Sequence, residues 1–139
     1  MTQVQKVLYT AHQHTTGGRD GGTSRSSDGR LDIHFSVPGT PATGTNPEQL
    51  LAAGWSACFI GAMARSASKM KIALPAGTAV DAEIDLCLTG DSFSLQARLD
   101  VTLPGLEPSV ARAVADGAHQ ICPYSKALRG NIDVAINVA

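Results

Sequence analysis

The chain has 139 residues, and 43% of them are hydrophobic, so about 60 apolar side chains are available for a folded core. This length suits one domain that spans residues 1–139. Eleven basic residues against 12 acidic residues leave a net charge of -1, and no basic stripe is present. That balance disfavours a nucleic-acid binder and a polybasic membrane anchor.

The first residues are polar, unlike the apolar centre of a secretory signal. The longest apolar stretch, residues 50–64, has 15 residues, fewer than the roughly 20 that cross a bilayer. We therefore expect a cytoplasmic protein with no membrane segment. Three cysteines in such a protein indicate catalytic, metal-binding or incidental roles rather than a disulfide framework.

The N-terminal third shows two alternating segments. Apolar residues alternate over residues 7–11, which predicts a first strand, and a glycine-rich turn follows at residues 17–22. The alternation is clearer over residues 31–37, which predicts a second strand that ends at Pro38.

A long helix is predicted after the loop at residues 38–45. Asn46 is a favourable N-cap residue, and Pro47 suits the first helical position, so the helix is expected from Pro47 to about Met70. Its middle is apolar on nearly every face and rich in alanine and glycine. Such a helix is expected to be buried, with other backbones packed closely against it.

The C-terminal half begins with a hairpin signal. Two alternating runs, residues 80–88 and 93–103, are separated by Gly90-Asp91. Three further elements are predicted: a helix over 109–121, a helical turn over 123–128 and a strand over 132–138.

This order of elements predicts an α+β domain with mostly antiparallel sheets around the buried central helix. In so small a chain, one sheet covers only one side of such an apolar helix. We therefore expect a homodimer in which the two copies share their central helices.

The three cysteines differ in their surroundings. Cys58 lies in the apolar helix, where the ordinary interpretation is a buried core thiol, inert unless a cation lies near it. Cys122 precedes Pro123, so it is expected to cap a helix, where the helix dipole and free N–H groups favour a thiolate. Cys87 lies on the opposite face of its strand from the apolar residues and is interpreted as incidental.

Two charged residues offer a functional alternative to an ordinary surface role. Arg19 is either a solvated loop residue or a guanidinium offered to a buried anion, and Glu48 either stabilises the helix start or orients Arg19. Ten residues separate Glu48 from Cys58, about 15 Å along a straight helix. Either the helix breaks near Gly54, or Glu48 serves the Cys58 of a partner chain.

The histidines were considered as metal ligands. His119 and Cys122 have a metal-like spacing, and His12 and His14 alternate along the chain. A tetrahedral zinc site requires three or four ligands that converge, and the sequence offers no second ligand pair. We expect no metal ion and no bound cofactor.

Three segments carry a family resemblance that extends over essentially the whole chain. They are Gly-Gly-Arg-Asp-Gly at 17–21, the run from Gly44 to Phe59, and Ala-His-Gln-Ile-Cys-Pro-Tyr-Ser at 118–125. With these segments the sequence resembles the organic hydroperoxide resistance (Ohr) proteins of the Ohr/OsmC superfamily. The resemblance implies a thiol peroxidase for organic hydroperoxides that is an intertwined homodimer with two sites at the subunit interface.

The resemblance also implies the site residues. Cys58 would be the peroxidatic thiol, Cys122 the resolving thiol, and Arg19 and Glu48 the activating pair. The reductant of the Cys58–Cys122 disulfide would be an external lipoyl-type dithiol, either dihydrolipoamide or a lipoylated protein. Candidate walls of an apolar substrate pocket are Trp55, Phe59, Ile60, Met63 and Tyr124, although each is also a common core residue.

The sequence leaves two competing functions open. A zinc or Cys–His hydrolytic protein would bind metal or cleave esters and would form no Cys58–Cys122 disulfide. A dimeric thiol redox sensor or small-ligand-binding module would use the same cysteines without turnover.

Overall fold

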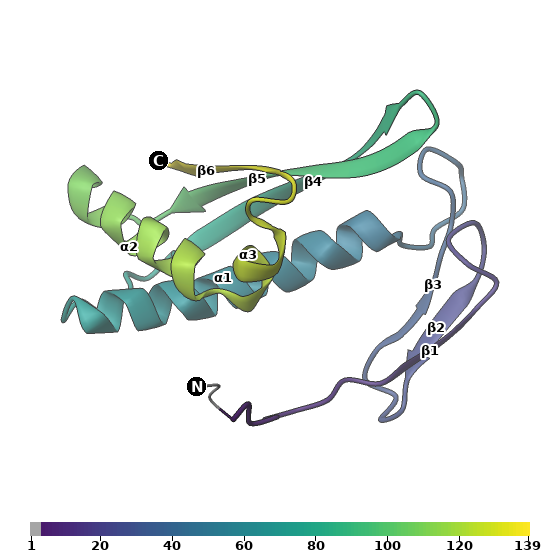
Figure 1. The fold of residues 1–139 in the computed structure, drawn as a ribbon, viewed down its shortest axis with the longest axis horizontal. Helices are drawn as coiled ribbons and strands as arrows, with labels where there is room; N and C mark the ends of the chain where they lie inside the picture. Colours follow the sequence, from purple (N-terminus) through teal and green to yellow (C-terminus); the bar gives the residue numbers. More distant parts are fainter. Residues whose placement is uncertain (1–3) are drawn as a thin grey trace. The chain divides into compact units, whose positions relative to one another are not determined.

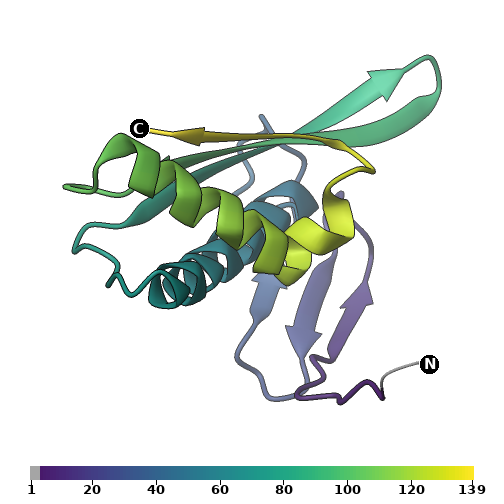
Figure 2. The ribbon, with the colours of Figure 1, turned by 60° about the vertical axis from the view of Figure 1, so that its left-hand side comes forward.

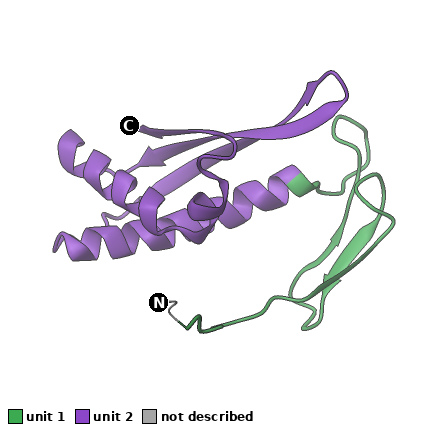
Figure 3. Ribbon diagram, in the orientation of Figure 1, with its two compact units in different colours: residues 1–47 green, residues 48–139 purple. Residues whose placement is uncertain are grey.

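Six strands and three helices are present in residues 4–139, the part of the chain that the computed structural model describes. They belong to two compact units, residues 1–47 and residues 48–139 (Figure 3). The α+β class is confirmed. The interpretation of residues 1–139 as one domain stays a prediction.

The first unit holds a three-stranded antiparallel sheet in the order β1-β2-β3, with bounds Gln13–Thr16, Thr23–Ser26 and Asp32–His34. The strand predicted over residues 7–11 is wrong, because this segment has no regular secondary structure. The sequence analysis also missed β2, whose polar residues give no apolar alternation. β3 confirms the strand predicted over residues 31–37 in shortened form.

The turn between β1 and β2 carries Arg19 at residues 17–22. It is closed by a hydrogen bond of 2.9 Å from the backbone N–H of Gly22 to the carbonyl oxygen of Gly18. A Cβ atom on Gly22 would overlap the carbonyl oxygens of Thr16 and Gly18. Only glycine therefore allows this closure, which presents Arg19 on a tight loop.

The second unit contains the predicted hairpin. β4 (Ala79–Thr89) and β5 (Ser92–Thr102) pair antiparallel from Thr89 opposite Ser92, so Gly90 and Asp91 form a two-residue turn. β6 (Asp133–Val138) then pairs with β5 in parallel, which gives the order β4-β5-β6.

Three helices lie on one side of this sheet (Figures 1 and 2). They are α1 (Pro47–Lys69), α2 (Pro108–Ile121) and α3 (Pro123–Leu128). α2 buries residues at helical spacing, Ala111, Val114, Ala115 and Ala118, as an amphipathic helix on a sheet does. The core joins these residues to Trp55, Phe59 and Met63 of α1 and to Leu99 and Val101 of β5.

Helix α1 begins at Pro47, as predicted, and continues without a break to Lys69. It is buried on one face only within this chain. Four exposed residues on it are small and follow one another at intervals of three or four: Ala53, Ala57, Gly61 and Ala64. The predicted burial on nearly every face is therefore not reached in one chain, where six of the 23 residues of α1 are buried. A homodimer that covers the exposed face stays a prediction.

By length and composition, α1 would also pass as a membrane span, since it is longer than the apolar stretch at residues 50–64. The core helix of a soluble protein passes the same test. Six residues of α1 are buried, among them Trp55, Phe59 and Met63, which belong to the core of the second unit. The cytoplasmic location stays a prediction.

Gly117 of α2 marks a close approach to α1. A Cβ atom on Gly117 would overlap the hydroxyl oxygen of Ser66 and lie 3.3 Å from its Cβ atom. Overpacking of this kind costs about 1–3 kcal/mol, more than alanine gains over glycine in a helix, about 1 kcal/mol.

We therefore expect Gly117→Ala to lower the free energy of unfolding in denaturant titrations followed by circular dichroism. Removal of the hydroxyl in a Ser66→Ala/Gly117→Ala double variant should restore part of the loss. A Gly117→Ala variant as stable as the native chain would contradict the close approach.

Candidate active site

Two thiols meet where α3 packs against α1. Cys58 lies in the fourth turn of α1 and is half-buried. Cys122 lies between α2 and α3 and is fully buried. The side chains of Cys58 and Cys122 lie close enough for each thiol to affect the other. The structure thus brings together the two cysteines that the resemblance pairs, and both are reduced.

Cys122 occupies the helix-capping position that the Cys-Pro sequence predicts. Its backbone is extended (φ -60°, ψ 124°), with Pro123 at the first position of α3. The backbone N–H of Cys122 still donates to the carbonyl oxygen of Ala118 at 2.8 Å, so the residue both ends α2 and begins α3. The Cys122 side chain makes no capping hydrogen bond, which leaves the sulfur directed to Cys58.

The surroundings of Cys58 oppose its ionisation. Burial raises the pKa of the Cys58 thiol, and the neighbouring Cys122 thiol raises it further. The nearby backbone N–H of Tyr124 acts in the opposite direction and lowers the pKa of Cys58. Because a thiolate is the nucleophile, a reactive Cys58 requires a further stabilising group, as the sequence analysis expects from Arg19.

Two more contacts join α3 to the same turns of α1. The indole Nε1 of Trp55 donates a hydrogen bond of 3.1 Å to the hydroxyl oxygen of Ser125, and both side chains are fully buried. The Tyr124 side chain lies against Gly54, where a Cβ atom would be 2.8 Å from the tyrosine hydroxyl. The sequence did not predict these two contacts, because the partners of Ser125 and Gly54 lie 70 residues away in the chain.

The predicted pocket residues separate into two groups. Trp55, Phe59 and Met63 are fully buried in the core of the second unit. Ile60 is half-buried, and Tyr124 keeps 39% of its surface exposed. Ile60 and Tyr124 are therefore the members of the set with surface to offer a substrate. A pocket role for the five residues stays a prediction.

Arg19 and Glu48 belong to different units. Arg19 lies in the turn between β1 and β2, and Glu48 lies in the first turn of α1. Because α1 is unbroken, Glu48 is about 15 Å from Cys58 along the helix axis, and the alternative of a break near Gly54 is removed. The pairing of Arg19 with Glu48 stays a prediction.

The remaining candidates play no part in this cluster of thiols. Cys87 is half-buried on β4, and its thiol lies 4.0 Å from the carbonyl oxygen of Asp85. The ring of His119 lies 6.5 Å from that of Phe59, and burial lowers the pKa of His119. Within residues 4–139, no three His, Cys, Asp or Glu side chains are arranged to hold a metal ion.

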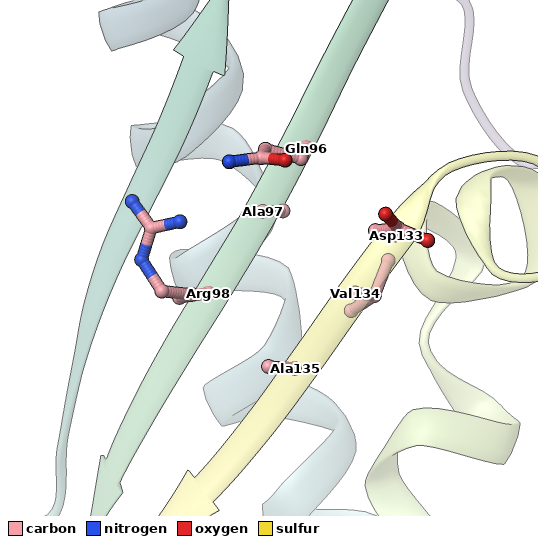
Figure 4. Close-up of a pocket in the computed structure, with 6 residues that line it drawn as sticks. All are labelled: Gln96, Ala97, Arg98, Asp133, Val134 and Ala135. Atoms are coloured by element: carbon pink, nitrogen blue, oxygen red, sulfur yellow. The ribbon is translucent and has the colours of Figure 1, made fainter.

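A depression of about 340 Å³ lies over β5 and β6 (Figure 4). Its residues are Gln96, Ala97, Arg98, Asp133, Val134 and Ala135. Arg98 extends toward β4, where it donates to both oxygens of Asp85 at 2.8 and 2.9 Å and to Glu83 at 3.2 Å.

This pairing, together with a hydrogen bond from Gln96, lowers the pKa of Asp85 to about 2. The Arg98 guanidinium is thus already paired with carboxylates of its own sheet. The depression lacks a nucleophile, so the thiol pair is the candidate active site.

The chain is similar over its whole length to known proteins of one family. Residues 38–137 match the family model for the OsmC-like protein. A relative from Xanthomonas axonopodis pv. citri named "Organic hydroperoxide resistance protein" is 44% identical over 143 residues, with all of both chains covered. Organic hydroperoxide resistance protein OhrB of Bacillus subtilis is 37% identical, with 95% of this chain and 98% of that protein covered.

The crystal structure of Bacillus subtilis OhrB superimposes with a TM-score of 0.89 at 36% identity. The superposition covers 96% of this chain and 100% of the OhrB chain. The fold that the sequence resemblance implied is confirmed.

We expect Cys122→Ser to lower the pKa of Cys58, because the substitution removes the neighbouring thiol that raises it. The midpoint of the pH dependence of Cys58 alkylation should move to lower pH, as measured by mass spectrometry of the Cys58 peptide. A Cys87→Ser control should leave the midpoint in place. A midpoint that stays or rises in Cys122→Ser would contradict the coupling of the two thiols.

Proposed function

The chain belongs to the OsmC-like family, and we propose that it defends the cell against organic hydroperoxides by reducing them to alcohols at Cys58. The observation that carries this proposal is the neighbouring pair of free thiols, one on α1 and one at the start of α3. A peroxidase that closes a disulfide in each cycle needs such a pair. The names of the relatives supply the substrate class.

In the proposed reaction the Cys58 thiolate attacks the terminal peroxide oxygen. A sulfur–oxygen bond forms, the oxygen–oxygen bond breaks, and the alkoxide takes a proton and leaves as the alcohol. Cys58 becomes a sulfenic acid. The Cys122 sulfur then attacks the Cys58 sulfur, the S–OH bond breaks, and the hydroxyl leaves as water with the thiol proton of Cys122.

An external dithiol completes the cycle. Two thiol–disulfide exchanges transfer its two electrons to the Cys58–Cys122 disulfide and restore both thiols. We propose a lipoyl-type dithiol, either dihydrolipoamide or a lipoylated protein, on the family resemblance of the site segments. The chain itself needs no bound cofactor or metal for this chemistry, because the redox centre is the cysteine pair.

Activation of Cys58 is assigned to Arg19 and Glu48. A guanidinium next to the sulfur would offset the burial that raises the pKa of Cys58, and a carboxylate would hold the guanidinium in plane. The unbroken α1 keeps Glu48 about 15 Å from the Cys58 of its own chain. We therefore propose that the Arg19–Glu48 pair of one protomer serves Cys58 of the other.

Two exposed apolar surfaces of the second unit support this homodimer. One is the small-residue face of α1, where another helix could approach closely. The other is the end of the β4–β5 hairpin, where Leu86, Leu88 and Phe93 are 47%, 60% and 70% exposed. Sedimentation equilibrium should give about twice the chain mass of 14.4 kDa, and a mass of one chain would contradict the shared site.

Apolar surface next to Cys58 accounts for a preference for organic hydroperoxides. Tyr124 packs against Gly54, one turn before Cys58 on α1, and keeps part of its surface exposed. Burial of a substrate hydrocarbon contributes about 0.8 kcal/mol per CH₂ group. Hydrogen peroxide has no such group and gains nothing from this surface.

Turnover tests the proposed function directly. We expect many cycles of alkyl hydroperoxide consumption per chain with dihydrolipoamide, and far slower consumption of hydrogen peroxide or with glutathione. Cys58→Ser should abolish consumption, and Cys122→Ser should allow one oxidation without recycling by the dithiol. The matched control Cys87→Ser should retain the native rate.

One equivalent of oxidation without turnover would instead favour the redox sensor, and no oxidation at all would favour the ligand-binding module. Retained turnover in Cys58→Ser would remove Cys58 as the peroxidatic thiol.

Loss of the arginine tests the activating pair. Arg19→Ala should raise the pKa of Cys58, because the opposite charge is lost. The pH midpoint of Cys58 alkylation should rise accordingly, and peroxide consumption at pH 7 should fall about tenfold or more. An unchanged midpoint would contradict the role of Arg19.

A further inference from the structure

One buried hydrogen bond ties the two cysteine-bearing segments together. Trp55 precedes Cys58 by three residues on α1, and Ser125 follows Cys122 by three residues on α3. The bond from the Trp55 indole to the Ser125 hydroxyl thus lies about one helical turn from each thiol. Both side chains are fully buried, so neither has water as an alternative partner.

Other contacts between α1 and α3 lie beside this bond. The Tyr124 side chain lies against Gly54, and the Tyr124 backbone N–H reaches the Cys58 sulfur. The Cys122 thiol reaches the same sulfur. α3 has only six residues, too few for a stable helix by itself, so its placement depends on such contacts with α1.

We propose that the Trp55–Ser125 hydrogen bond is a positioning link that seats α3 on α1 so that Cys122 and the Tyr124 N–H reach the Cys58 sulfur. The effect of this link on turnover rests on the proposed function. Its effect on the placement of the two thiols relative to each other does not depend on that function. Trp55 and Ser125 are positioning residues, since neither is required to touch the substrate.

Disulfide formation is the step most sensitive to this link. The two Cα atoms must lie about 5.5–6 Å apart and the sulfurs must align before the new bond forms. Misplacement of reacting groups by about 1 Å commonly costs about a hundredfold in rate. Loss of the link should therefore slow closure of the Cys58–Cys122 disulfide. It should also lower the pKa of Cys58, because the Cys122 thiol that raises this pKa retreats and its effect is larger than that of the Tyr124 N–H.

The test uses the full-length chain with Cys87→Ser, which leaves Cys58 and Cys122 as its thiols. Ser125→Ala removes the acceptor, Trp55→Phe removes the donor but keeps an aromatic ring, and a double variant removes both. Ser66→Ala is the matched control, since Ser66 is also a buried serine but lies two turns beyond Cys58 on α1. Circular dichroism confirms the fold of each variant, and either single variant suffices if the other does not fold.

Disulfide closure is driven with diamide, an azodicarboxamide that accepts the two electrons and two protons of the thiol pair. Ser125→Ala and Trp55→Phe are each expected to slow closure by roughly tenfold to a hundredfold. The double variant should be no slower than the slower single variant, because both substitutions break one bond. The Ser66→Ala control should close at the native rate.

Two further readouts separate positioning from general destabilisation. The pH midpoint of Cys58 alkylation should fall in Ser125→Ala and Trp55→Phe but not in Ser66→Ala. Trp55 is the sole tryptophan of the chain, so its fluorescence should change in Ser125→Ala and stay native in Ser66→Ala. Native closure rates and native midpoints in both single variants would overturn the link, as would slowing by Ser66→Ala to the same extent.

Diamide also separates failure of the link from failure of the proposed function. If the native chain closes the disulfide with diamide and the variants do not, the link stands even where alkyl hydroperoxide is not consumed. If the native chain turns over hydroperoxide and both variants close the disulfide with diamide at the native rate, the proposed function is supported and the positioning link is contradicted.

Discussion

The seating of α3 on one turn of α1 is the contact on which the candidate site depends. Through it the Cys122 thiol and the Tyr124 N–H both reach the Cys58 sulfur, although 64 residues separate the two cysteines. The sheet β4-β5-β6 and helix α2 provide the core beneath this contact, and the break at Pro123 turns the chain so that Cys122 faces α1. Much of the second unit thus serves to hold the side chains of Cys58 and Cys122 next to each other.

Burial fixes the positions of the Cys58 and Cys122 thiols, but it also makes Cys58 a poor nucleophile by itself. An apolar setting raises the pKa of the thiol, which protects it from unspecific oxidants at neutral pH. The group proposed to reverse this effect, Arg19, lies on a glycine-closed turn in the other unit. If Cys58 depends on Arg19 for its ionisation, the thiolate forms only where both segments are assembled into one site.

Strong periodicity made much of the second unit predictable. The hairpin around Gly90-Asp91 and the helix that begins at Pro47 follow from apolar alternation and from proline and glycine signals. β2 was missed because its residues are polar, and the segment at residues 7–11 alternates without pairing. The parallel pairing of β6 with β5 depends on tertiary packing that alternation does not encode.

The site was predictable where one residue type carries its own physical reason. A cysteine before a helix-starting proline is an unusual cap, and the motif resemblance paired it with Cys58. The Trp55–Ser125 hydrogen bond joins residues 70 positions apart, so no local sequence pattern predicts it.

Peptide mapping after one equivalent of an alkyl hydroperoxide tests the central claim most directly. Trypsin places Cys58 in residues 31–65, Cys122 in residues 113–126 and Cys87 in residues 72–98. We predict that mass spectrometry without reductant finds residues 31–65 cross-linked to residues 113–126, with two hydrogens lost and one alcohol released per chain. A cross-link that includes residues 72–98, or an oxidised Cys58 with Cys122 left as a free thiol, would contradict the account.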